Sequence, residues 1–136
     1  MTIVLDASVA MAWCFEDETT PYTEAVLQRV RDESAVASTV WPLELVNVLL
    51  VGERNGRHSA EHSMAFMRLI SELPISIESV ELEKAFNPVA ALGREHLLSS
   101  YDASYVWLAM KEGLSLATLD QRVRRACQRI GVSLVT

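Results

Sequence analysis

Short apolar runs recur along the chain and are separated by longer segments with helical periodicity. The runs occupy residues 3–5, 35–38, 75–77, 116–118 and 133–135. The first run, Ile-Val-Leu, shows no alternation of apolar and polar residues, which favours a parallel strand buried on both faces over a half-exposed strand. The pattern predicts short buried strands at these five places.

Capping and stop residues divide the intervening segments into helices. Thr20 can cap a helix that has Pro21 at its first position and runs to about Arg31. Ser59 can cap another, in which apolar residues recur at helical spacing up to Leu73. The other expected helices are one from Pro42 to about Asn55, one interrupted at Asn87-Pro88, one that ends at Gly113 and one that ends at Gly131.

Strands that alternate with helices indicate an α/β fold of three layers, in which a central, mostly parallel sheet is flanked by helices. The chain has 136 residues, half of them hydrophobic, and no linker, repeat or low-complexity segment divides it. We therefore expect residues 1–136 to form a single domain with its own core.

Cysteine spacing, the lengths of apolar stretches and net charge indicate the cellular compartment of the protein and the partners it can bind. Cys14 and Cys127 lie far apart in sequence and suit two reduced core residues better than a disulfide. No basic leader and no apolar stretch of ~20 residues is present, so we expect a cytoplasmic protein that does not enter a membrane. The formal charge of −6 argues against nonspecific attraction to nucleic acid, but that objection weakens if several acids hold cations.

Two acidic residues follow predicted strands. Asp6 comes directly after the first run, and Asp120 comes one residue after Leu119. Ligands of open parallel sheets bind beyond the carboxyl ends of the strands, where helix N-termini also point. The alternative is a purely local role, as a turn residue for Asp6 and as the N-cap of the last helix for Asp120.

Two further acids stand near predicted helix starts. Glu44 lies in the apolar segment WPLELVNVLLV, whose only other polar side chain, Asn47, is three residues away on the same face. A carboxylate in such surroundings is costly unless something pairs with it, although a favourable interaction with the helix dipole is the alternative. Asp102 follows Ser99 and Ser100, a position that by itself needs no function.

Together, two strand ends and two helix starts can bring these four carboxylates into one crevice. Without cations they would repel one another and raise one another's pKa. Mg²⁺ and Mn²⁺ prefer oxygen ligands, and Mg²⁺ typically takes one or two protein carboxylates directly. The sequence therefore predicts a metal site suited to phosphoryl transfer.

Four segments, in this order and at these spacings, resemble the PIN domain family and in particular its VapC-type ribonuclease toxins: IVLDASV, WPLELVNVL, SSYDASYVWLA and LATLDQRV. The resemblance spans nearly the whole chain. It implies an endoribonuclease that depends on Mg²⁺ or Mn²⁺, forms a homodimer and is inhibited by a VapB-type antitoxin. RNA would be the substrate, and DNA would be contacted only through the antitoxin.

The resemblance also implies roles for individual residues. It places four carboxylates in the catalytic pocket: Asp6, Glu44, Asp102 and Asp120. Of these, Asp6 and Asp102 resemble the direct metal ligands. Three polar residues resemble supporting positions: Ser8, Asn47 and Thr118. Because no acid of the quartet is missing, the resemblance argues against a noncatalytic member.

Other residues have plainer alternatives. Four arginines of the last helix could guide RNA phosphates toward the pocket, or could form a solvated helix face that complements the helix dipole: Arg122, Arg124, Arg125 and Arg129. His58 and His62 stand four residues apart but lack the H-E-x-x-H order of a zinc site.

Two alternative functions stay open. The chain could be a noncatalytic PIN-like binding module that acts only through a partner protein. It could also be an aspartate-based phosphohydrolase, although that chemistry usually has a second Asp two residues after the first, where this chain has Ser8.

Overall fold

A parallel sheet of four short strands crosses the middle of the molecule in the computed structural model, which describes residues 1–136. The strands are β1 (Ile3–Leu5), β2 (Ala35–Ser38), β3 (Ile75–Glu78) and β4 (Leu116–Ala117). Their order is β3-β2-β1-β4, and every neighbouring pair is parallel. In β1, Val4 pairs with Val36 on one side and with Leu116 on the other.

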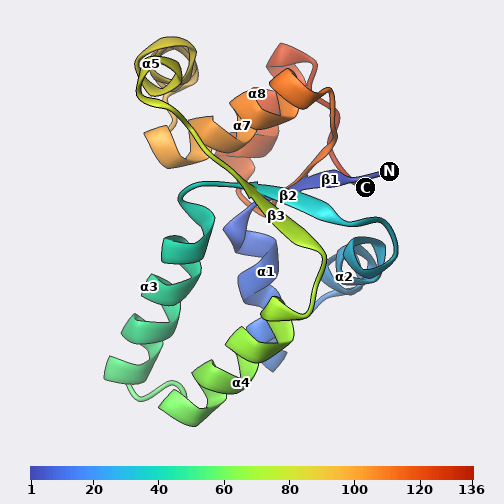
Figure 1. Cartoon of the computed structure of the whole chain (residues 1–136), viewed down its shortest axis with the longest axis vertical. Helices are drawn as coiled ribbons and strands as arrows, with labels where there is room; N and C mark the ends of the chain where they lie inside the picture. Colours follow the sequence, from blue (N-terminus) through green and yellow to red (C-terminus); the bar gives the residue numbers. More distant parts are fainter.

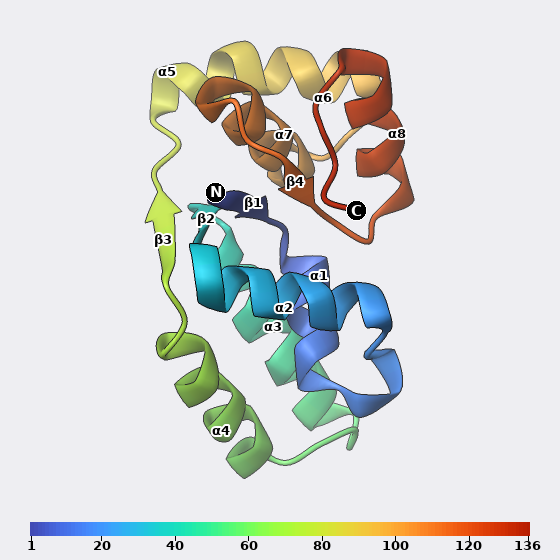
Figure 2. The same ribbon diagram turned by 90° about the vertical axis from the view of Figure 1, so that its right-hand side faces the viewer.

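Helices cover both faces of this sheet (Figures 1 and 2). On one face lie α1 (Ala7–Cys14), α2 (Pro21–Glu33), α3 (Trp41–Arg54) and α4 (Ala60–Ser71). On the other lie α5 (Leu82–Lys84), α6 (Ala90–His96), α7 (Ser100–Glu112) and α8 (Gln121–Ile130). Two short segments complete the chain: the 3₁₀ turn η1 (Glu16–Glu18) and the π-helical turn η2 (Ala85–Val89). The predicted three-layer α/β fold is confirmed.

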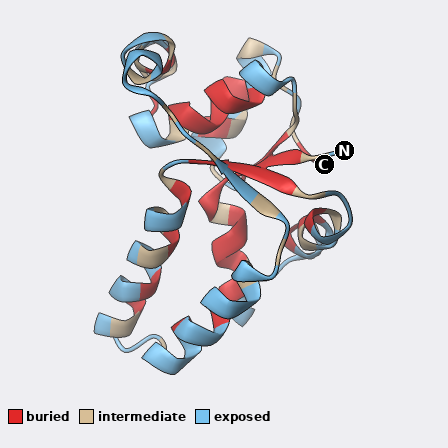
Figure 3. Cartoon of the chain, in the orientation of Figure 1, coloured by how far each residue is buried: buried red, intermediate tan, exposed pale blue.

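The core is centred on β1 and on the helices that sandwich it, α1 and α7 (Figure 3). All three residues of β1 are fully buried, as a strand with helices on both faces requires. In α7 every residue from Ala103 to Ala109 is buried. No sequence pattern indicated α1, because this helix is buried on almost every side and so shows no polar face from which a helical period could be recognised.

Most predicted helix ends agree with the structure. The side chain of Thr20 accepts a hydrogen bond from the Thr23 N–H, and that of Ser59 accepts one from the His62 N–H. Gly113 and Gly131 end their helices with left-handed backbone at φ 66° and 91°, a conformation that glycine adopts without steric cost. At the predicted interruption, Asn87 is extended within η2.

The fifth predicted strand, at residues 133–135, is wrong. Leu134 forms only an isolated bridge to Leu116 at the edge of the sheet. The Leu116 N–H donates to the Ser133 carbonyl and the Val135 N–H donates to the Leu116 carbonyl, after which the chain ends at Thr136. The apolar run thus pairs with β4 at a single parallel bridge and does not form a strand.

Both cysteines are free and buried, as predicted. Burial raises the pKa of the Cys14 and Cys127 thiols to about 11, so each is held as an unreactive thiol. None of the helices has the length and apolar character needed to cross a membrane.

Helix α3 offers a test of the packing, because it buries one leucine and exposes another. Leu49 is 1% exposed and Leu43 is 74% exposed. We predict that Leu49→Ala lowers the free energy of unfolding by about 2–5 kcal/mol, since it removes buried apolar contacts and leaves a cavity. Leu43→Ala should change it by less than about 0.5 kcal/mol. Urea unfolding of both variants measures the difference, and equal losses would contradict the placement of α3.

Candidate active site

The site lies where the order of the strands reverses. From β1 the chain moves to β2 and β3 on one side, and it returns to the other side of β1 to form β4. In a parallel sheet such a reversal opens a crevice at the carboxyl ends of the two strands that flank it. Asp6 follows β1 directly, and Thr118 and Asp120 follow β4, so these residues stand at that crevice.

Hydrogen bonds join the loop after β1 to the loop after β4. The Asp6 N–H donates to the Ala117 carbonyl at 3.1 Å. The Thr118 hydroxyl donates to Asp6 Oδ2 at 2.5 Å, and the Leu119 N–H donates to Ser8 Oγ at 3.0 Å. The predicted supporting residues Ser8 and Thr118 therefore fix the two loops to each other, with the Asp6 carboxylate between them.

The local roles considered for Asp6 and Asp120 are both present. Asp6 is the N-cap of α1, with Oδ1 accepting from the Ser8 N–H at 3.2 Å. Asp120 is the N-cap of α8, with Oδ1 accepting from the Arg122 and Val123 N–H groups at 2.8 and 3.1 Å. Capping uses Oδ1 of each carboxylate and so orients both side chains, and Oδ2 of Asp6 also accepts the Thr118 hydroxyl.

The other two acids come from the first turns of α3 and α7. The Asp102 N–H donates to the capping hydroxyl of Ser99 at 3.1 Å. One turn further along α7, the buried Tyr105 hydroxyl donates to Glu44 Oε1. This hydrogen bond joins α7 to α3 and fixes the orientation of the Glu44 carboxylate. Tyr105 stands three residues after Asp102, on the same face of the helix, and that spacing is the only signal of its role in the sequence.

All four carboxylates line one pocket of about 500 Å³: Asp6, Glu44, Asp102 and Asp120. Ser8 lines it as well. Thr118 is buried beneath it through its bond to Asp6. Asn47, which the resemblance placed beside Glu44, is exposed and does not line the pocket.

The pocket holds its carboxylates in an environment that disfavours their charge. Burial is the main cause that raises the pKa of Asp6, Glu44 and Asp102 above the ordinary values. Neighbouring carboxylates raise them further: Asp120 acts on Asp6, and Asp6 acts on both Glu44 and Asp102. The hydrogen bonds from Thr118 and Tyr105 act in the opposite direction, because they stabilise the ionised forms.

These donors fit a hard divalent cation that keeps most of its water. Every polar side-chain atom that the four acids and Ser8 offer is oxygen, the donor that Mg²⁺ and Mn²⁺ prefer. No three His, Cys, Asp or Glu side chains lie close enough together to form a closed metal cage. An ion bound by one or two carboxylates plus water needs no such cage. The repulsion among the acids is a reason for the pocket to accept positive charge.

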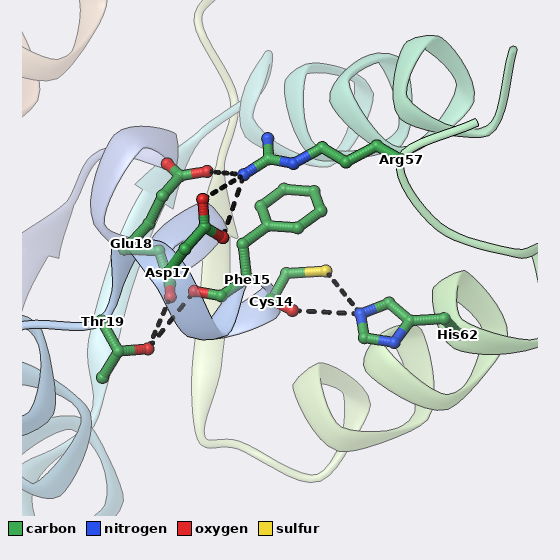
Figure 4. Close-up of polar contacts among 8 residues, drawn as sticks. Cys14, Phe15, Asp17, Glu18, Thr19, Arg57 and His62 are labelled. Carbon is green, nitrogen blue, oxygen red and sulfur yellow. Dashed lines mark hydrogen bonds and ion pairs between the residues drawn. The ribbon is translucent and has the colours of Figure 1, made fainter. Parts of the chain in front are cut away.

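The far wall of the pocket contains residues that the sequence did not indicate (Figure 4). Phe15, Glu18 and Arg57 line it. The Arg57 guanidinium lies 3.6 Å from the centroid of the Phe15 ring, and its Nη2 lies 2.5 Å from Glu18 Oε2 and 3.4 Å from Asp17 Oδ1. These interactions join the turn after α3 to η1, so they close one end of the pocket with a paired cation.

A separate group of polar contacts joins α1 to α4 behind this wall (Figure 4). His62 Nε2 lies 3.0 Å from the Cys14 carbonyl oxygen and 3.5 Å from Cys14 Sγ. The ring of His58 lies against Gly52 so closely that a Cβ there would come within 2.3 Å of it. His58 Nε2 is hydrogen-bonded to Ser63 Oγ at 2.9 Å. The two histidines therefore serve packing between helices.

The four arginines of α8 that were expected to meet RNA do not share one environment, and Arg129 lines the same cleft as Arg122 and Arg125. Arg124 donates to the Thr118 carbonyl at 2.8 Å and lies over the Tyr22 ring, 5.8 Å from its centroid, so it supports the loop beneath the pocket. Arg122 and Arg125 are exposed and line a separate cleft. The positive charge of Arg122 lowers the pKa of Asp102, in opposition to burial and to the neighbouring acids.

The fold and the pocket define an α/β protein with an acidic site at the carboxyl edge of a parallel sheet. The chain belongs to the PIN domain family, whose family model matches residues 3–128. No curated protein gives a significant match to the sequence.

Several solved structures share this fold. PAE2754 from Pyrobaculum aerophilum is 23% identical, with a TM-score of 0.67 over 93% of this chain and 87% of its own. VapBC2 from Rickettsia felis, bound to a DNA fragment from their promoter, is 11% identical, with a TM-score of 0.69 over 99% and 98% of the two chains. VapC20 from Mycobacterium tuberculosis, a toxin that cleaves the sarcin-ricin loop, is 16% identical, with a TM-score of 0.64 over 91% and 94%.

The raised pKa of Asp102 predicts a gain of stability when its charge is removed. Because the pKa is higher in the folded state than in the unfolded chain, ionisation destabilises the fold as the pH rises through the folded-state value. In EDTA near neutral pH, Asp102→Asn should therefore melt a few degrees above the wild type, and the gap should shrink as the pH falls below the pKa of Asp102. Glu83→Gln removes an exposed acid outside the pocket and should show no such trend. A lower melting temperature of Asp102→Asn throughout would refute the repulsion.

Proposed function

We propose that this chain is a metal-dependent endoribonuclease and the toxin of a VapBC-type toxin-antitoxin pair. The observation that supports this most strongly is the convergence of four carboxylates, from two strand ends and two helix starts, on one pocket of a PIN domain. A site of oxygen donors without a nucleophilic Cys or Ser–His pair suits hydrolysis of a phosphodiester by an activated water.

Asp6 and Asp102 are the residues that would hold the ion. The hydrogen bonds from Thr118 and the Ser8 N–H keep the Asp6 carboxylate in one orientation. The position of Asp102 follows from the cap of α7 at Ser99. When bound, Mg²⁺ or Mn²⁺ would supply charge neutralisation for the phosphate oxygens and lower the pKa of a bound water.

Glu44 is placed to receive a proton. Its Oε1 accepts the Tyr105 hydroxyl, while Oε2 has no protein partner and is free to face a water in the pocket. The pKa of Glu44 is raised by burial, which makes it a better base than an ordinary carboxylate. In the reaction the water oxygen forms a bond to phosphorus and gives its proton to Glu44, and the bond to the departing ribose oxygen breaks. That oxygen then takes a proton from solvent.

The proposed partners follow from the resemblance and from the similar structures. One of these is a toxin that cleaves the sarcin-ricin loop, and another is VapBC2 bound to promoter DNA. We accordingly propose RNA as the substrate, a VapB-type antitoxin as the inhibitor, and contact with DNA only through that antitoxin. Large exposed apolar side chains on α3 and α4, among them Leu43, Met64 and Leu69, are the kind of surface that such a partner or a second copy would cover.

The two alternative functions have less support. The general acid of a phosphohydrolase would stand two residues after Asp6, where Ser8 instead accepts a hydrogen bond from the Leu119 N–H and holds two loops together. A noncatalytic binding module gives no reason for carboxylates that raise one another's pKa in one pocket.

Cleavage of RNA tests the proposal directly. Purified protein should cut labelled RNA in Mg²⁺ or Mn²⁺ and stop in EDTA. Glu44→Gln should lower the rate by about 10²–10⁴-fold, because it removes the proton acceptor, and Asp6→Asn or Asp102→Asn should lower it at least as far. Asp32→Asn, at an exposed position of α2, is the matched control and should keep the wild-type rate. Undiminished cleavage by all three pocket variants would refute the site.

Metal binding can be measured apart from catalysis. Mg²⁺ that binds only the folded state should raise its stability, by about 2.7 kcal/mol at a hundred times Kd. Melting curves of the wild type should therefore shift upward with Mg²⁺ concentration, while those of Asp102→Asn should shift much less. A wild-type melting temperature that does not respond to Mg²⁺ or Mn²⁺ would count against a metal site in this pocket.

A further inference from the structure

Helix α8 lies near the end of α6 (Figure 2). Residues of α8 and of the end of α6 line a second polar cleft. Its volume is about 450 Å³, and five residues line it: His96, Leu97, Arg122, Arg125 and Arg129. No carboxylate lines it. The three arginines stand at i, i+3 and i+7 of α8 and therefore form one stripe on the helix, whereas Arg124 is turned to another face.

These arginines form no close ion pair within the protein, although the charge of Arg122 acts on Asp102. None of the three takes part in an ion pair, whereas Arg29 and Arg57 pair with Glu33 and Glu18. The only side-chain hydrogen bond among them runs from Arg129 Nε to His96 Nδ1 at 3.3 Å. Like charges that converge in a chain of net charge −6 mark this surface as a site for an external anion.

The other two lining residues shape the cleft. His96 has a side chain that is 9% exposed, and its Nδ1 accepts from Arg129, so the ring holds that guanidinium in place. Its Nε2 faces Glu95 Oε2 at 4.0 Å, outside the cleft. Leu97 is 82% exposed and adds an apolar surface beside the arginines. Guanidinium groups next to an apolar side chain suit a ligand that carries both phosphates and flat apolar groups.

Arg122 connects this cleft to the acidic pocket. Its N–H donates to Asp120 Oδ1 in the wall of the pocket, and its side-chain charge lowers the pKa of Asp102. The cleft thus begins at the edge of the carboxylate site. Arg122 therefore lies between the residues of the cleft and the carboxylates of the pocket.

We infer that the cleft formed by Arg122, Arg125, Arg129 and Leu97 binds the phosphate backbone of the RNA next to the bond that is cut. This inference rests on the proposed ribonuclease function and adds a phosphate-binding surface to the carboxylate pocket. One RNA strand can contact both surfaces. Its neighbouring phosphates would bind the arginines, while the phosphate to be cleaved would lie at the carboxylates that would hold the ion. An acidic protein segment fits less well, since its continuation into the pocket would meet four carboxylates.

Binding of RNA without cleavage tests the inference. In full-length protein carrying Glu44→Gln, in Mg²⁺, the affinity for fluorescein-labelled single-stranded RNA is measured by anisotropy over a range of salt concentrations. Replacing both Arg125 and Arg129 by Ala should weaken binding and lower the slope of log K against log salt by about 1.4, because each phosphate that an arginine neutralises contributes about 0.7 to that slope. Replacing both by Lys should restore most of the slope, because the charges return.

Arg68→Ala is the matched control. Arg68 is exposed on α4, across the sheet from the cleft, and takes part in no ion pair. Its replacement should leave both affinity and slope unchanged. Equal melting temperatures of all variants show that each is folded, and the Lys pair separates loss of charge from loss of fold.

The outcomes separate this inference from the proposed function. If the slope is unchanged in the Ala pair while Asp102→Asn still abolishes cleavage, the cleft does not bind RNA phosphates, and the proposed ribonuclease function is retained. An Ala pair that binds RNA normally but fails to bind an acidic peptide or the antitoxin makes the cleft a protein site and also overturns it. No binding or cleavage of RNA by the unmodified chain would defeat both proposals together.

Discussion

The rest of the site depends on one constraint: the Asp6 carboxylate is buried at the carboxyl end of the central strand. A charge in that position is costly unless hydrogen bonds or ions compensate it. Thr118 and the Ser8 N–H supply hydrogen bonds, and the same residues hold the loops after β1 and β4 together. The chain then brings three more carboxylates into the same pocket, and the pKa of two of them, Glu44 and Asp102, stays raised despite their hydrogen bonds. The convergence of the four carboxylates on one pocket therefore both forms the site and, without a bound cation, destabilises the folded protein.

Charge in this molecule is separated rather than mixed. Acids occupy the edge of the sheet at the reversal of strand order, and unpaired arginines occupy a stripe of α8 directly beside them. The net charge of −6 hides this arrangement, since it averages over both surfaces. In the proposed complex with RNA, the arginines of α8 would attract the phosphates and the acidic pocket would hold the divalent ion. The pocket is closed at its other end by Arg57, which is neutralised by Glu18.

The positions of the acids could be predicted well because strand ends and helix caps are local features of the sequence. Asp6, Asp102 and Asp120 each lie where a short apolar run or a capping Ser indicated. Interactions between distant segments could not be predicted in this way. The bond from Tyr105 to Glu44 and the stacking of Arg57 on Phe15 join residues 61 and 42 positions apart in the chain.

The two errors in the predicted elements have different physical causes. Helix α1 has no recognisable period because it is buried on almost every side. Residues 133–135 look like a strand because a strand and a segment that forms a single parallel bridge share the same apolar composition.

We propose that the four carboxylates form a site for a divalent ion at the reversal of strand order. Anomalous diffraction from crystals of the wild-type protein grown with Mn²⁺ tests this most directly, because it locates the metal without reference to activity. We expect a peak in contact with carboxylate oxygens of Asp6 and Asp102. A peak only elsewhere, for example beside Cys14 and His62, or an empty pocket at saturating Mn²⁺ would contradict it.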